Sequence, residues 1–122
     1  MDKIKSFTDL NTWKDAHALV LMVYEATKKF PKEEIFVLVP QMRRCAISIS
    51  SNIAEGFSRK SKKEKTQFYH MGLGSITEPQ DQLLISQDLN YINKEEFTKI
   101  AEQTVRVSKL INGLIKSSRD HI

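Results

Sequence analysis

The amino-acid sequence predicts an all-α protein: an antiparallel four-helix bundle with up-down-up-down topology, formed by one domain over residues 1–122. Only four Gly and three Pro occur, too few turn residues for a many-stranded β protein. Four stretches carry apolar residues at three- and four-residue steps, the period of an amphipathic helix. Apolar residues make up 40% and charged residues 28% of the chain, so it can bury a core and is too apolar to be disordered.

The first predicted helix runs from about Asp9 to Lys29. Thr8 or Asp9 can cap its start, and Pro31 ends it because the residue before a proline disfavours the α conformation. Its core stripe comprises Leu10, Trp13, Ala16, Val20, Val23 and Thr27. Other apolar residues point away from this stripe, namely Leu19, Leu21 and Met22. We therefore expect the helix to be buried on more than one side.

The second predicted helix runs from about Pro40 to Glu55, and Gly56 is placed to take the left-handed position after its end. One stripe is apolar and consists of Met42, Ala46, Ile49 and Ile53. A second stripe at the same period is polar and consists of Gln41, Arg44, Ser48, Ser51, Asn52 and Glu55. Two stripes indicate that this helix contacts more than its own core.

The third predicted helix begins at Ser61, which forms a capping box with Glu64, and continues to about Asn90. Pro79 lies inside it. Because proline lacks an N–H and clashes with the carbonyl four residues earlier, that of Ser75, we expect a kink there. Two further glycines of this helix, Gly72 and Gly74, are expected to allow close packing.

The fourth predicted helix begins at Asn93, with Glu96 completing another capping box. Its apolar stripe is regular and consists of Phe97, Ile100, Thr104, Val107, Ile111 and Leu114. The connections after the second and third helices are a few residues long, which forces neighbouring helices to run antiparallel. The segment 31–39 is longer but permits the same arrangement.

No residue set for catalysis or metal binding is recognisable. The histidines are scattered, at His17, His70 and His121, and Glu78 with Asp81 forms a single acidic pair without a partner motif. Cys45 has two interpretations: Arg44 beside it lowers the pKa of a reactive thiol, or the thiol is a small buried side chain. The second is the commoner case. We therefore expect no enzyme activity, no metal, no cofactor and no small-molecule substrate.

The single cysteine suits a reducing cytoplasm. The longest apolar run, residues 18–24, is seven residues long, whereas crossing a bilayer takes roughly 20. The residues before it are polar rather than basic, which argues against a signal peptide. We expect a cytoplasmic protein without membrane contact.

Positive charge is concentrated in one segment. Residues 39–65 hold seven basic and two acidic residues, a net +5, whereas the rest holds twelve basic and thirteen acidic residues, a net −1. The basic residues are Arg43, Arg44, Arg59, Lys60, Lys62, Lys63 and Lys65. Lysines at a helix N-terminus each cost roughly 0.3–1 kcal/mol, so stability alone does not explain this placement. Two interpretations stay open: the lysines keep the protein soluble, or they bind an anion such as a nucleic-acid phosphate.

Residues 41–61 resemble the central signature of a bacterial family. The matching residues are Gln41-Met-Arg43-Arg44-Cys-Ala46-Ile-Ser48-Ile, then Ser51-Asn52-Ile-Ala54-Glu55-Gly56, Arg59 and Ser61. Further matches are Leu10, Trp13, Phe30-Pro31, Gly74-Ser75, Glu78, Gln82-Leu83 and Tyr91-Ile92. The family is the four-helix-bundle proteins first met as reading frames in intervening sequences of 23S ribosomal RNA genes.

This resemblance implies a bundle that assembles into a barrel-like homopentamer. A structurally similar relative, the accessory variability protein of diversity-generating retroelements, binds nucleic acid and a reverse transcriptase through a basic surface. The sequence departs from the family pattern at Lys65, Pro79, Gln80 and Asn90, where an aromatic residue, Leu, Glu and Gly are expected.

We therefore expect a non-catalytic homo-oligomer whose seven basic residues contact RNA or DNA phosphates. The alternative is a protein-interaction scaffold with no nucleic-acid role, reached through the polar stripe of the second helix. A structural or interface motif is expected at Gln41, Ser48, Asn52, Glu55 and Gly56.

Overall fold

The computed structural model describes residues 3–120, with side chains as far as Ser118. Within this range the chain forms helices and no strand, which confirms the predicted all-α class. Two short 3₁₀ helices, η1 (Phe7–Asp9) and η2 (Lys32–Glu34), accompany five α-helices: α1 (Asn11–Thr27), α2 (Leu38–Ser58), α3 (Lys62–Gly74), α4 (Thr77–Asp88) and α5 (Lys94–Asp120).

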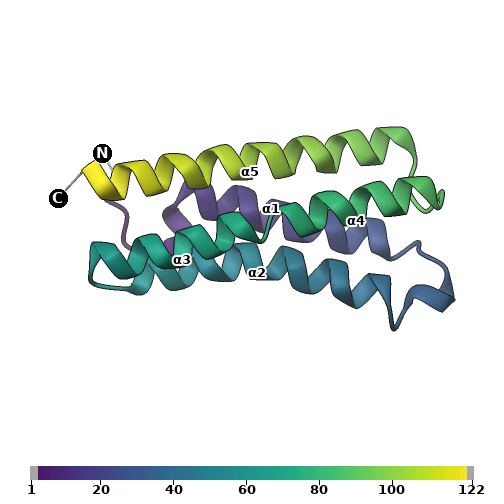
Figure 1. The fold of residues 1–122 in the computed structure, drawn as a ribbon, viewed down its shortest axis with the longest axis horizontal. Coiled ribbons are helices and arrows are strands. Elements are labelled where there is room, and N and C mark those ends of the chain that lie inside the picture. Colours follow the sequence, from purple (N-terminus) through teal and green to yellow (C-terminus); the bar gives the residue numbers. More distant parts are fainter. Residues whose placement is uncertain (1–2, 121–122) are drawn as a thin grey trace.

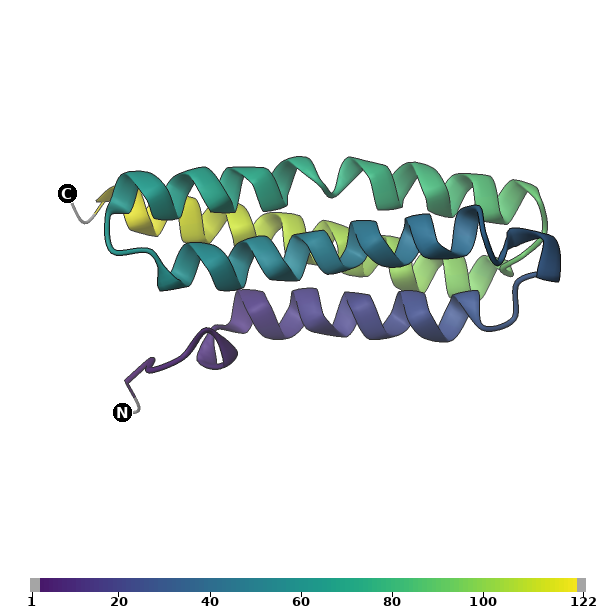
Figure 2. The same ribbon diagram turned by 90° about the horizontal axis from the view of Figure 1, so that it is seen from below.

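The helices lie side by side as long rods (Figure 1). α3 and α4 follow one another along a single rod, which packs against α2 on one side and α5 on the other (Figures 1 and 2). α1 packs against α2 and α5 and completes the circuit. Successive rods run in opposite directions, so the α2–α3 turn and the end of α5 lie at the same end of the molecule (Figure 1). No helix among the described residues is both long and apolar enough to cross a membrane.

The core lies between the rods and follows the predicted stripes closely. Fully buried side chains include Ala16, Val23, Met42, Ala46, Ile49, Ile53, Val107 and Ile111. Leu19, which was expected to point away from the core, is also fully buried. Leu21, two residues later, is 56% exposed, as the pattern predicted.

Two of the three predicted side-chain caps at helix starts are confirmed. The Glu96 N–H donates to Asn93 Oδ1 at 2.8 Å, and the Asn93 N–H donates back to Glu96 Oε1 at 3.4 Å. The Glu64 N–H donates to Ser61 Oγ at 3.1 Å at the start of α3. The predicted cap of the first helix is wrong, because Ser6 caps η1 and α1 begins after it without a side-chain cap.

The predicted kink in the third rod lies before Pro79, not at it. α3 ends at Gly74 and α4 begins at Thr77, so Pro79 falls in the first turn of α4. There its missing N–H needs no helical partner, and the break relieves its clash with the Ser75 carbonyl.

Gly56 corrects a second prediction. α2 continues through it to Ser58, and no glycine among the described residues has a positive φ. Gly56 is buried instead, and a Cβ there would lie 2.6 Å from Tyr69 Cε1. Gly72 also lies against α2, but a Cβ there would lie 3.4 Å from Asn52 Cβ, an ordinary van der Waals distance, so the contact is close without requiring glycine. Gly74 has open space around it, so the packing expectation is wrong for that glycine.

Candidate nucleic-acid interface

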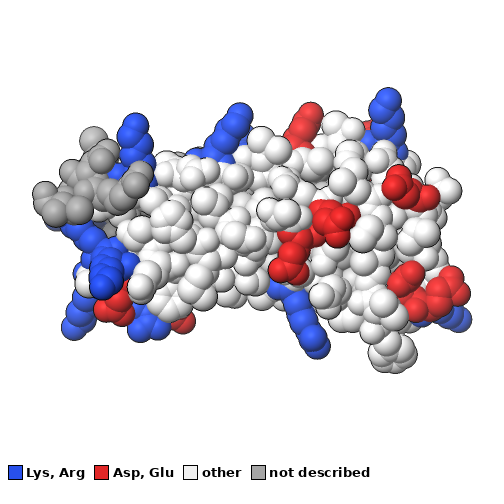
Figure 3. Space-filling view, in the orientation of Figure 1, with Lys and Arg blue, Asp and Glu red and all other residues white. Residues whose placement is uncertain are grey.

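The turn between α2 and α3 gathers three lysines around the N-terminus of α3. Lys60 lies in the turn, and Lys62 and Lys63 are the first two residues of α3. We call these three residues the basic turn. Lys60 and Lys63 are exposed and Lys62 is half-buried. Within the described part of the chain, none of the three makes an ion pair. Figure 3 shows Lys and Arg side chains gathered at this end of the molecule.

Arg59 lies beside the basic turn but is occupied by contacts within the protein. Its Nη2 is 3.1 Å from Glu55 Oε2, and its guanidinium lies 4.8 Å from the centroid of the Phe68 ring. Its Nε is buried without a hydrogen-bond partner. These contacts hold Arg59 against the bundle and leave its charge partly compensated.

Lys65 turns back onto the end of α2. Its Nζ donates to the Phe57 carbonyl at 2.6 Å and lies 5.2 Å from the centroid of the Phe57 ring. Burial lowers the pKa of this amine. Lys65 thus satisfies a carbonyl at the C-terminus of α2, and its charge is not presented to a ligand as was expected.

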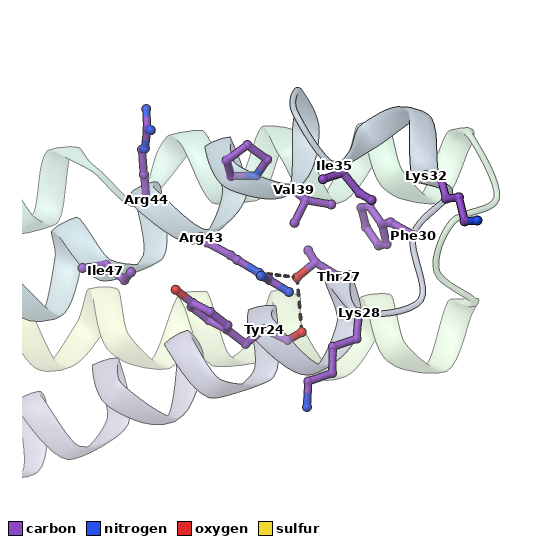
Figure 4. A pocket seen from close by; sticks show the side chains of 11 residues that line it. Tyr24, Thr27, Lys28, Phe30, Lys32, Ile35, Val39, Arg43, Arg44 and Ile47 are labelled. Atoms are coloured by element: carbon purple, nitrogen blue, oxygen red, sulfur yellow. Dashed lines mark hydrogen bonds between the residues drawn. The ribbon is translucent and has the colours of Figure 1, made fainter.

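Arg43 and Arg44 are separated from the basic turn by the length of α2. Arg43 and Arg59 are sixteen positions apart, or about 24 Å at the rise of an α-helix. Arg43 Nε donates to Thr27 Oγ1 at 3.0 Å, and its guanidinium lies 4.3 Å from the centroid of the Tyr24 ring (Figure 4). The seven basic residues predicted as one site therefore do not form one surface.

A groove between α1 and α2, which the sequence reasoning missed, surrounds Arg43. Its volume is about 610 Å³. Apolar and basic side chains from both helices and η2 line it: Tyr24, Thr27, Lys28, Phe30, Lys32, Ile35, Val39, Pro40, Arg43, Arg44 and Ile47 (Figure 4). We call it the α1–α2 groove. Its residues are spread over 24 positions of the chain, so no local motif reveals it.

The predicted structural motif of α2 contains half-buried residues, Ser48 and Asn52, and exposed residues, Gln41 and Glu55. Asn52 Nδ2 donates to the Ser48 carbonyl at 2.8 Å, and the Ser48 and Ser75 hydroxyls are hydrogen-bonded at 3.3 Å across to the end of α3. Glu55 pairs only with Arg59 and Ser58 of its own helix end, and such an exposed pair is worth about 0–1 kcal/mol.

Cys45 lies in a polar contact between α2 and α4. Its thiol donates to Glu78 Oε2 at 3.1 Å and accepts a bond from Gln82 Nε2 at 3.4 Å. Burial, and then the bond to Glu78, raise the pKa of the thiol. These contacts favour the interpretation of Cys45 as a packed side chain over the one in which Arg44 activates it, because a thiol kept protonated is a poor nucleophile. Among the described residues, no cluster of three or more His, Cys, Asp or Glu could hold a metal ion.

The chain is similar to known proteins over most of its length. The family described as 23S rRNA-intervening sequence protein matches residues 8–113. A crystal structure of a protein of unknown function from the S23 ribosomal protein family of Bacteroides thetaiotaomicron shares the fold, with a TM-score of 0.76 and 20% identity. The alignment covers 86% of this chain and 98% of that one. No curated protein matches the chain. The family match confirms the resemblance seen in the sequence, and the chain belongs to the 23S rRNA-intervening sequence protein family.

Proposed function

We propose that the protein is a non-catalytic, cytoplasmic, homo-oligomeric accessory protein that binds RNA or DNA through the basic turn. The observation that carries this proposal is the set of three lysines around the α3 N-terminus, none of which makes an ion pair with a described residue. Neighbouring cations of the same region, Arg59 and Lys65, are held in contacts within the bundle. Of the basic residues around the α2–α3 turn, those of the basic turn are therefore best placed to bind an external anion.

Stability does not explain this arrangement. The first N–H groups of a helix lack intrahelical partners and carry partial positive charge, so Lys62 and Lys63 each cost roughly 0.3–1 kcal/mol there. A phosphate bound at the same place would accept from these N–H groups and compensate the lysines. The charge that is unfavourable in the free protein becomes favourable in a complex.

Binding is expected to follow phosphate charge rather than base sequence. Two aromatic side chains of this region, Phe57 and Phe68, contact Lys65 and Arg59 of the bundle. They do not form an open platform on which bases could stack. Phosphate contacts position a protein on nucleic acid but carry no direct sequence information.

We propose a homopentamer for the assembly, as the family resemblance implies. Large apolar side chains are exposed on several elements, including Ile35, Phe36, Val37, Leu84, Ile85 and Leu89. Exposed apolar surface of this extent is typical of a protein that associates. A ring would repeat the basic turn around its axis and multiply weak phosphate contacts through avidity.

The test replaces Lys60, Lys62 and Lys63 together by Glu and measures binding to mixed-sequence RNA and DNA at about 50 mM salt. A matched control replaces Lys94, Lys99 and Lys109, three exposed lysines of α5 outside the basic turn and the α1–α2 groove, with the same change in net charge. We expect the first variant to lose binding and the control to keep most of it. Equal loss in both variants would indicate only general charge attraction.

The alternative function is a protein-interaction scaffold. The observation that favours it is the exposed outer part of the α2 polar stripe, Gln41, Arg44 and Ser51, which lacks a partner among the described residues. If the wild-type protein does not bind either nucleic acid at about 50 mM salt, this scaffold function takes precedence.

A further inference from the structure

We propose that the segment 33–37 of one subunit docks into the α1–α2 groove of a neighbouring copy. We call this segment, Glu33-Glu34-Ile35-Phe36-Val37, the apolar loop. The inference rests on the homo-oligomer in the proposed function, and it names the surfaces through which the copies meet.

The apolar loop exposes three consecutive large apolar side chains. Ile35 is 50% exposed, Phe36 92% and Val37 65%. The chain nonetheless holds this loop in place, because Tyr91 Oη donates to Glu34 Oε2 at 2.8 Å and the Tyr91 ring lies 5.1 Å from the Phe30 ring. An apolar group presented on an anchored segment loses little conformational freedom on binding. Phe36 is therefore suited to insert into a complementary surface.

The α1–α2 groove is complementary to this loop in both shape and charge. Its volume of about 610 Å³ lies in the range of sites that enclose a ligand-sized group. The described lining residues include four basic residues and no acidic one. Arg43 is fixed on the Tyr24 ring and Thr27, and its terminal nitrogens make no hydrogen bond to any described residue. Such a groove fits an apolar side chain flanked by a carboxylate.

The apolar loop has this composition. Glu33 is exposed and lies three residues before Phe36. Phe36 does not fill the groove of its own subunit: Ile35 lines the groove, whereas Phe36 is absent from the lining and almost fully exposed (Figure 4). The Phe36 side chain and the α1–α2 groove are different parts of one subunit's surface, so inserting Phe36 of one copy into the groove of the next is a head-to-tail contact. Such a contact closes into a ring where the rotation between copies permits it.

The test uses one variant for each side of the contact. Phe36→Ser removes the inserted side chain, and Ile47→Glu places a carboxylate in the groove at a position that is 38% exposed. We expect each variant alone to lose the wild-type oligomer mass in light scattering and to give the 14.1 kDa single chain. Met71→Ser, which alters an exposed apolar residue of α3 outside the groove, should keep the wild-type mass.

Mixing the two variants makes the test specific. Phe36→Ser keeps an intact groove and Ile47→Glu keeps an intact loop, so an equimolar mixture should form a dimer that cannot extend further. A mixture that stays monomeric, or variants that keep the wild-type mass, would overturn the docking proposal while the oligomer stands. A monomeric wild type would overturn the oligomer and the docking together, and nucleic-acid binding by the basic turn would be judged separately.

Discussion

At the scale of single residues, two positions of α2 are constrained by side chains of α3 and α4. One constraint limits the size of the residue at position 56, and the other affects the pKa of the Cys45 thiol. Gly56 lies against the buried ring of Tyr69, and Cys45 lies against Glu78 and Gln82. Each contact joins residues more than ten positions apart in the chain. Both can be altered by a single substitution with a matched control.

Replacing Gly56 by Ala should destabilise the protein. The added Cβ would lie 2.6 Å from Tyr69 Cε1 and 2.8 Å from Tyr69 Cδ1, so the ring or α2 must shift. Overpacking of this kind typically costs about 1–3 kcal/mol. Urea denaturation should show a lower midpoint for Gly56→Ala, whereas Gly74→Ala, with nothing within 4 Å, should not lower it. Equal midpoints for Gly56→Ala and wild type would contradict the packing role.

Replacing Glu78 by Ala should lower the pKa of the Cys45 thiol. Burial and the hydrogen bond to Glu78 raise that pKa above the ordinary value, and the substitution removes the second cause. The thiolate is the reactive form, so the midpoint of the alkylation rate against pH should move to lower pH. Asp81→Ala, which removes an exposed carboxylate of the same helix, should leave the midpoint unchanged. A midpoint that is the same in all three proteins would refute the contact.

At the scale of elements, the end of α4 depends on a residue in the left-handed conformation. Asn90 has a φ of 64°, the only positive value among the described non-glycine residues. Its N–H donates to the Gln87 carbonyl at 2.9 Å, and the Tyr91 N–H donates to the Ser86 carbonyl at 2.8 Å. This is the Schellman pattern, which favours glycine at the left-handed position. Glycine, the residue that the resemblance led us to expect at position 90, would suit the same conformation.

Replacing Asn90 by Gly should stabilise the protein slightly, and replacing it by Ala should destabilise it. Glycine reaches positive φ without steric cost, whereas alanine pays about 1–2 kcal/mol for the left-handed conformation. We expect the melting temperature to rise in the order Ala, Asn, Gly at position 90. An alanine variant that melts at or above the wild type would show that this conformation is not required.

The elements also show which features a sequence can and cannot predict. Ser61 and Asn93 were identified as caps because their partners lie three residues away in the chain. Gly56 was misassigned because a glycine near a helix end has two explanations, and only the position of Tyr69 distinguishes them. The break before Pro79 was displaced from its expected place because proline is tolerated in the first turn of a helix.

At the scale of the whole molecule, the rigid rods decide which charges act together. The basic turn could be predicted because a short connection keeps Lys60, Lys62 and Lys63 adjacent in space as in sequence. Arg43 could not be assigned correctly, since its position depends on Tyr24 and Thr27 of another helix. The α1–α2 groove was missed for the same reason. Basic residues that are close in sequence thus share one surface when they flank a short turn, but not when they are spread along a helix.

The charge-reversed basic turn should also make the free protein more stable. Lys60, Lys62 and Lys63 replaced by Glu would place negative charge at the α3 N-terminus, where each favourable charge contributes roughly 0.3–1 kcal/mol at low salt. The variant should therefore melt at a higher temperature than the wild type, and the difference should shrink as salt is added. A variant that melts lower would show that these lysines stabilise the bundle.

The salt dependence of nucleic-acid affinity tests the central claim most directly. Each phosphate neutralised contributes about −0.7 for a single strand to −0.9 for a duplex to the slope of log affinity against log salt. We expect a steep negative slope for the wild type, and a shallower one, by roughly two to three per bound basic turn, when Lys60, Lys62 and Lys63 are replaced by Gln. A wild-type affinity that does not change with salt, or the same slope in both proteins, would contradict phosphate binding by the basic turn.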